Sequence, residues 1–304
     1  MAAAPHSLEP GGTTPALKAT GRVARRQWMS RASFWVLLAA TLVGLVVLAY
    51  LLADIVRTGG ERLVRDWPSF ITHYASRREA RAGIRAALLG SAWITGLTVF
   101  FTIPVGVGTA IWIEEFAPRN RITTLIRLNI SNLAGVPSII YGILGLAVFA
   151  RLMDLGGTII TGALTLSLMV LPIVIISAAE AIRQVPSSLR DGSLALGATK
   201  WETVWHHVLP GSIPGIMTGV ILAISRAIGE TAALIMIGAY AFVAFDPTGV
   251  NDRFTILPIQ IYDWTTRPGD NFKAEATAAI IVLMVFVLSL NLIAVLIRNR
   301  FRHD

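Results

Sequence analysis

Six long apolar runs alternate with polar segments along the chain. They cover residues 34–56, 86–112, 128–150, 159–181, 213–240 and 276–297. Each run has roughly 20 residues or more, which is enough for a helix to cross the hydrocarbon core of a bilayer. The runs lack the alternation of apolar and polar positions that marks the strands of a membrane β-barrel. The pattern therefore predicts an all-α polytopic membrane protein with six transmembrane helices.

Composition supports this prediction. Hydrophobic residues make up 54% of the 304 residues and charged residues 14%, against about 45–50% and 25% in soluble domains. The absence of cysteine excludes a disulfide framework, a zinc–thiolate site and a cysteine nucleophile. The net charge of +8 is explained by contact with anionic lipid headgroups and by basic cytoplasmic loops, without nucleic acid.

The two ends of the chain are basic. Residues 1–33 are predicted to form a disordered basic tail, residues 34–56 an uncleaved signal anchor, and residues 298–304 a second short tail. Six spans place both tails on one side, and their charge predicts that this side is the cytoplasm. The basic residues of the tails are Lys18, Arg22, Arg25, Arg26, Arg31, Arg298, Arg300 and Arg302.

The charge balance between the two sides is narrow. With this topology, 14 Lys or Arg lie in cytoplasmic segments and 11 in external ones, seven of them in the predicted external loop 57–85. The inverted topology therefore stays an alternative. The favoured interpretation of this loop is a solvated amphipathic helix, and the other is a surface that draws anions or an acidic partner. Its arginines are Arg57, Arg62, Arg65, Arg77, Arg78, Arg81 and Arg85.

Residues 183–212, between the fourth and fifth runs, have an amphipathic pattern. Apolar residues recur at helical spacing, Gly197 interrupts them and Pro210 follows. The pattern predicts a short, bent helix along the membrane surface. Two tryptophans, Trp201 and Trp205, also fit a purely interfacial anchor.

The spacing in this segment resembles the EAA loop of ABC importer permeases. Three residues separate Asp191-Gly192-Ser193 from Gly197, and eleven more precede Leu209-Pro210. The chain departs from that motif at its acid, at both alanines and at His207. The resemblance implies a coupling helix that docks on an ATPase subunit. The residues carried over are Asp191, Gly192, Ser193, Ala195, Leu196, Gly197, Ala198, Trp201, Leu209 and Pro210.

Two further strings, RLNISNLAGVPSIIYGILGL at 127–146 and SRAIGETAALIMIGA at 225–239, resemble the PstA-type permeases of the bacterial phosphate importer. The resemblance runs from about Gly83 to Ile297. It implies a type I ABC importer fold with a core at 86–297, no enzyme activity and no cofactor. It also implies a PstC-like sister permease, a dimer of PstB-like ATPases and an external PstS-like phosphate-binding protein. Molybdate, thiosulfate or phosphonate stay alternative substrates, and a stand-alone channel is a distant one.

The chain itself carries no Gly-x-x-x-x-Gly-Lys-Ser/Thr motif, which fits an ATPase on another subunit.

One arginine lies at the middle of the fifth run. Burying Arg226 at bilayer depth is costly, and Glu230 lies four residues on, which on a continuous helix would be the same face. One interpretation is a structural ion pair, in which Arg226 and Glu230 neutralise each other's charge and so allow the helix to insert. Alternatively, Arg226 binds phosphate with its planar guanidinium, while Glu230 accepts a proton that phosphate carries and sulfate lacks.

The third run supplies possible companions. Gly135, Pro137 and Gly142 interrupt its helical pattern, and its polar residues Asn132, Ser138 and Tyr141 join Arg226 and Glu230 as candidates for the substrate pathway. Irregular backbone at membrane depth fits a wet cavity, whereas the glycines fit close helix packing equally well.

The remaining polar clusters are assigned no chemistry. Glu114 and Glu115 are predicted to lie in a solvated turn, and His206 and His207 on the docking surface. No group of residues has the spacing of a metal site.

Overall fold

The computed structural model describes residues 21–240, 242–267 and 272–300. All regular elements in these ranges are helical, as predicted. The chain divides into two units, Met1–Asp54 and Ile55–Asp304. Lys18, with most of the predicted N-terminal tail, and Arg302 lie outside the described residues.

Helix α1 (Gly21–Thr72) begins earlier than the apolar pattern indicates. The prediction of disorder up to residue 33 is wrong for residues 21–33. This stretch holds four arginines, two alanines, one glutamine and one methionine, which favour helices, and no proline. The apolar side chains of residues 34–48 are mostly exposed, as expected for a helix that faces lipid.

The second part of α1 occupies much of the predicted external loop 57–85. Its backbone stays helical to Thr72, apart from Asp66 (φ −160°, ψ 60°), just before Pro68. In this unit Arg62 forms an ion pair of 3.1 Å with the buried Glu275. Arg85 binds Asp246 through two nitrogens. Two of the seven arginines are therefore already paired with carboxylates, which weakens the interpretation of the loop as an anion-attracting surface.

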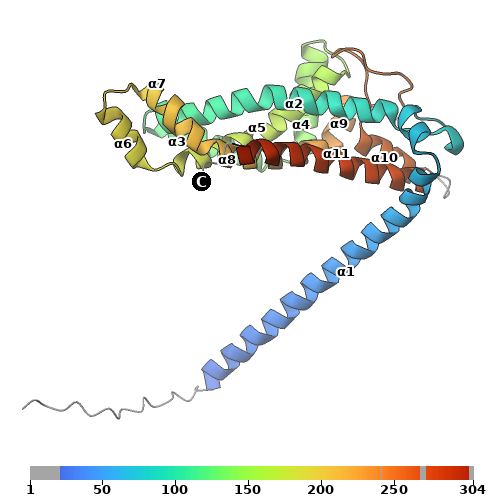
Figure 1. Cartoon of the computed structure of the whole chain (residues 1–304), viewed down its shortest axis with the longest axis horizontal. Helices are drawn as coiled ribbons and strands as arrows, with labels where there is room; N and C mark the ends of the chain where they lie inside the picture. Colours follow the sequence, from blue (N-terminus) through green and yellow to red (C-terminus); the bar gives the residue numbers. More distant parts are fainter. Residues whose placement is uncertain (1–20, 241, 268–271, 301–304) are drawn as a thin grey trace, which may run out of the picture. The chain divides into compact units, whose positions relative to one another are not determined.

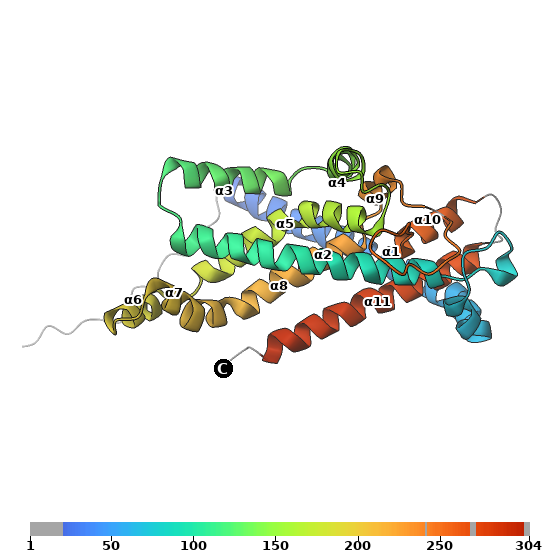
Figure 2. The same cartoon turned by 90° about the horizontal axis from the view of Figure 1, so that it is seen from above.

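Long helices that lie side by side form the core of the second unit (Figure 2). Helix α5 packs against both α2 and α8. The contact with α8 depends on small residues, because a Cβ added at Gly219 of α8 would lie 2.0 Å from the Oγ atom of Ser177 in α5. The helices are α2 (Arg85–Ile111), α3 (Arg121–Ala134), α4 (Ser138–Gly145), α5 (Ile159–Arg183), α6 (Ser187–Ala195), α7 (Lys200–Thr203), α8 (Leu209–Ile228), α9 (Ala232–Ile237), α10 (Leu257–Thr266) and α11 (Lys273–Arg300).

Short π-helical segments extend three of these helices. They are η2 (Trp112–Phe116) after α2, η3 (Leu146–Leu152) after α4 and η4 (Val204–Val208) between α7 and α8, and a 3-10 turn, η1 (Glu79–Arg81), precedes α2.

Within the residues that the structure describes, five helices are long and apolar enough to cross a membrane, and a sixth span is possible if a bent pair counts as one. That pair is Arg121–Ala134 with Ser138–Leu152, bent by 101°. The interruption that Gly135 and Pro137 predict in the run 128–150 is therefore confirmed, and this run is not one continuous helix. Pro137 has no N–H to donate and disfavours helical backbone at Val136, so the helix stops here.

The predicted fifth span, 213–240, is also interrupted. Helix α8 ends at Ile228, and a separate short helix, α9, follows after Gly229, Glu230 and Thr231. Arg226 consequently lies in the last turn of α8, where a positive charge faces the negative end of the helix dipole. It does not occupy the middle of a continuous span.

Candidate functional site

The segment predicted to couple the chain to an ATPase folds as two short helices. Helices α6 and α7 lie at one end of the core, far from α10 (Figure 1). They meet at Gly197, whose φ of +88° is strained for any residue with a side chain. Leu209 and Pro210 begin α8 directly after η4. The bent amphipathic helix expected from the sequence is confirmed in its geometry.

Large apolar side chains cover the tip of this segment. Leu196, beside the Gly197 turn, is 91% exposed. Leu194, Trp201 and Trp205 are also exposed, and the two indole rings stack with their centres 5.9 Å apart. Such a patch indicates a surface that meets another molecule.

A buried polar contact joins the two short helices, and an exposed cap begins the second. Ser193 and Thr203 share a hydrogen bond of 2.9 Å between their hydroxyls. Thr199 and Glu202 form a reciprocal capping box at the start of α7. The apolar tip is therefore presented by a rigid support.

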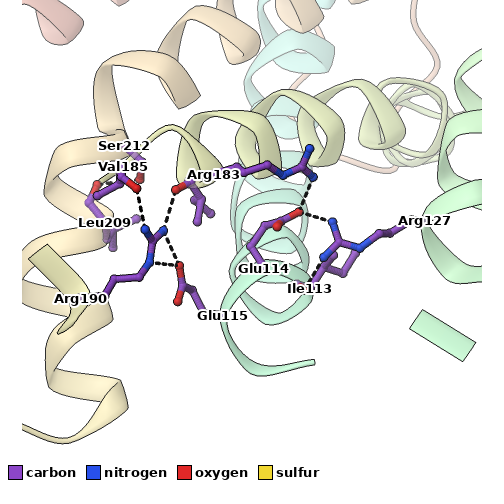
Figure 3. Close-up of polar contacts among 10 residues, drawn as sticks. Ile113, Glu114, Glu115, Arg127, Arg183, Val185, Arg190, Leu209 and Ser212 are labelled. Atoms are coloured by element: carbon purple, nitrogen blue, oxygen red, sulfur yellow. Dashed lines mark hydrogen bonds and ion pairs between the residues drawn. The ribbon is translucent and has the colours of Figure 1, made fainter. Parts of the chain in front are cut away.

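The end of α2 is connected to this segment by ion pairs that the sequence did not reveal (Figure 3). The Glu115 carboxylate accepts two hydrogen bonds from Arg190 of α6, at 2.8 and 3.0 Å. Glu114 accepts from Arg183 at 2.9 Å and also pairs with Arg127 of α3. The Glu114 and Glu115 side chains are only 10% and 9% exposed. The prediction of a solvated turn is therefore wrong.

At the bend between α3 and α4, the candidate pathway residues have different roles. The Tyr141 hydroxyl donates a 2.8 Å hydrogen bond to the carbonyl of Leu133, and Tyr141 is only 4% exposed. It therefore braces the bend. Asn132 is exposed and Ser138 is half-buried at the first position of α4.

Gly142 serves packing. A Cβ at this position would lie 2.7 Å from the carbonyl oxygen of Ala233 in α9. The sequence left two interpretations of the glycines in this run, a wet cavity or close helix packing, and at Gly142 the structure shows close packing.

Arg226 and Glu230 do not share one helix face. Glu230 Oε1 accepts hydrogen bonds from the backbone N–H groups of Ala232 and Ala233, at 3.1 and 3.3 Å, so this carboxylate caps α9. Among the described residues, no ion pair joins Glu230 to Arg226. The expectation of a pair on one continuous helix is wrong.

One residue before Arg226, Ser225 donates a 2.9 Å hydrogen bond to Asn291 of α11. Nothing in the sequence singles out this contact, because Asn291 is one of three polar residues in the last apolar run, with Thr277 and Ser289. The hydrogen bond attaches α11 to α8 beside the candidate arginine.

Broken spans beside a charged residue, together with an apolar helical tip, are features of transport subunits. A family profile described as the inner membrane component of binding-protein-dependent transport systems matches residues 80–303. The chain belongs to this family of ABC transporter permeases.

Individual relatives agree with the family. The permease is 36% identical over 235 residues to the probable ABC transporter permease protein YqgI of Bacillus subtilis, which covers 73% of this chain and 80% of that protein. It is 31% identical over 255 residues to the phosphate transport system permease protein PstA of Mycobacterium leprae, covering 83% and 82%. The MetNI methionine ABC transporter in an inward-facing conformation shares the fold, with a TM-score of 0.58 and 17% identity over 72% of this chain and 96% of that chain.

Family membership defines the kind of subunit. The permease is a multi-pass inner membrane protein without catalytic activity of its own. It works with a partner permease, an ATPase and a binding protein.

Proposed function

We propose that this permease carries inorganic phosphate and that Arg226 binds it. The observation that carries the proposal is the match to permeases named for phosphate transport over more than four fifths of this chain, in Mycobacterium leprae and Mycobacterium tuberculosis. The position of Arg226 in the last turn of α8, where the span is interrupted, supports it. A guanidinium there offers two parallel N–H donors to phosphate oxygens.

Glu230 holds a second element of this site in place. By capping α9 through Oε1, it fixes the start of the helix that packs on Gly142 of α4. In this proposal its other oxygen, Oε2, accepts a proton of phosphate. A fully ionised sulfate has no proton to offer and is rejected.

The test uses the permease reconstituted with its partner permease, ATPase and binding protein in vesicles. Uptake of radioactive phosphate should be unaffected by molybdate, thiosulfate or a phosphonate. Arg226→Lys, which keeps the charge and loses the planar fork, should reduce uptake severely. Arg65→Lys, an exposed arginine of α1, is the matched control. Equal uptake by the Arg226→Lys and Arg65→Lys permeases would contradict the role of Arg226.

We also propose that α6, Gly197 and α7 dock on the ATPase through the apolar tip. The rigid turn and the exposed Leu196 support this role. Leu196→Asp should abolish co-purification of the ATPase, because it places a charge in an apolar contact. Ser188→Asp, at an exposed position of α6 away from the tip, should leave co-purification intact. Normal binding by both variants would exclude docking at this tip.

The docking side is proposed to be cytoplasmic, with both termini on that side. Single cysteines introduced at the exposed Arg77 and Ser188 give a clean test, because the chain has no cysteine. In intact cells an impermeant thiol reagent should label Arg77→Cys and not Ser188→Cys. The reverse labelling would establish the inverted topology.

A further inference from the structure

Two adjacent carboxylates at the end of α2 hold elements that lie far apart in the chain. Glu115 binds Arg190, 75 residues away, and Glu114 binds Arg183, 69 residues away. Neighbouring residues in a helical turn point in different directions. The π-helical segment η2 therefore directs Glu115 to α6, and Glu114 to α3 and the end of α5.

Arg190 donates more hydrogen bonds than Arg183 or Arg127, the other two arginines of this cluster. Besides Glu115, its guanidinium donates to the carbonyls of Val185 at 2.6 Å and Ile182 at 2.8 Å. These carbonyls lie at and just beyond the end of α5, where backbone acceptors lack helical partners. Arg190 thus joins α6, the end of α5 and the end of α2 in one set of charge-assisted hydrogen bonds.

Arg127 makes the corresponding connection on α3. Its guanidinium pairs with Glu114 and donates a 2.8 Å hydrogen bond to the carbonyl of Ile113. Helix α3 leads directly into the bend of 101° that Tyr141 braces. Two sets of ionic contacts, joined through the backbone of the adjacent Glu114 and Glu115, therefore connect α6, the end of α2 and the helix that enters the bent span (Figure 3).

We propose that Glu114 and Glu115 are positioning residues that transmit a displacement of α6 to α3 and so to the bend. This inference rests on the proposed docking of α6 and α7 on the ATPase. The two carboxylates are nearly buried, so each needs its cationic partner to stay charged at low cost. A link of this kind is stiff, because α6 cannot move away without leaving the buried Glu115 unpaired, and α3 cannot move away without removing one of the two cationic partners of Glu114.

The assembled transporter in vesicles provides the test. Glu115→Gln and Glu114→Gln should leave ATPase co-purification and the rate of ATP hydrolysis unchanged. Phosphate taken up per ATP hydrolysed should fall about tenfold, within the range of coupling between sites. Glu180→Gln is the matched control, because Glu180 pairs with the same Arg183 on the surface and is 55% exposed. It should transport normally.

Additivity tests the link itself. If Glu115 and Arg190 act as one unit, the double variant Glu115→Gln with Arg190→Gln should lose no more than either single variant. If these variants fail to assemble, the more conservative variant Arg190→Lys can be measured in their place. Its ammonium can pair with Glu115 but cannot also reach both carbonyls in the same fork, so uptake per ATP should still fall.

Normal uptake per ATP in Glu115→Gln, Glu114→Gln and Arg190→Lys would overturn the link. Loss of co-purification in step with uptake would also overturn it, because the ion pairs would then only support the docking surface. If the docking proposal is wrong, the result is different, because the ATPase would then still co-purify with the Leu196→Asp variant.

Discussion

The two interrupted spans of this permease are broken by different means. Between α3 and α4, Pro137 removes a backbone donor and the Tyr141 hydroxyl bridges the bend. Between α8 and α9, no proline is present, and the Glu230 carboxylate caps the second helix. The first break is fixed by covalent structure and a neutral hydrogen bond. The second depends on the hydrogen bonds that one carboxylate near Arg226 accepts, and we therefore expect substitutions there to affect transport more.

The largest effect is expected at the second break. Arg226→Gln should reduce phosphate uptake at least about thirtyfold, because a charged, bidentate contact is lost. Adding Glu230→Gln should not restore uptake, since Glu230 binds backbone N–H groups of α9. Uptake by the unsubstituted permease, the Arg226→Gln and Glu230→Gln variants and the double variant, at matched expression, checks this. Rescue by the double change would show a self-neutralising pair and remove the contrast between the breaks.

The next effect concerns the contact between the two broken spans. Gly142→Ala should destabilise the permease by about 1–3 kcal/mol, because the new Cβ would meet the backbone of Ala233 at 2.7 Å. Gly108→Ala is the control: nothing lies within 4 Å of its Cβ position, and alanine favours the helix. Thermal unfolding in detergent measures both. An equal Tm for the two variants would mean that α4 and α9 are not in such close contact.

A smaller effect is expected at the first break. Tyr141→Phe leaves the bend without its 2.8 Å hydrogen bond to Leu133 and should cost about 1 kcal/mol. Tyr262→Phe, at an exposed tyrosine of α10, should cost almost nothing. Comparison of their unfolding midpoints sharpens the contrast, because the same loss in both variants would remove Tyr141 from the bend.

The smallest effect is in the segment that follows α9. The Arg85 guanidinium, bound to Asp246 at 2.6 Å, holds the pKa of that carboxyl below its usual range. Stability from this pair is therefore present above the pKa of Asp246 in the unfolded chain and is lost as pH falls through the lower pKa of the folded protein. Asp246→Asn should flatten the dependence of Tm on pH in this acidic range. An unchanged pH profile would mean that the pair contributes nothing.

The sequence predicts features that are local and fails where contacts are distant. Hydropathy identifies the spans, and Gly197 and Pro137 mark a turn and a break, because each acts through its own backbone. The end of α8 at Ile228 was missed, since Gly229 is one of four glycines in this apolar run and the cap by Glu230 needs three-dimensional geometry. The partners of Glu114 and Glu115 lie on other elements, so their residue types alone suggested a solvated turn.

The hydrogen bond between Ser225 and Asn291 has a consequence for the alignment of α11 along α8. Two apolar helices in lipid can slide past each other at little cost, because lipid tails are as apolar as leucine. A displacement by one helical turn, about 5.4 Å, would leave Asn291 without its Ser225 partner in hydrocarbon, although the Ser225 hydroxyl could keep its hydrogen bond to the carbonyl of Ile221. This one contact therefore selects a single register from several of similar packing energy, and it does so next to the arginine on which transport is proposed to depend.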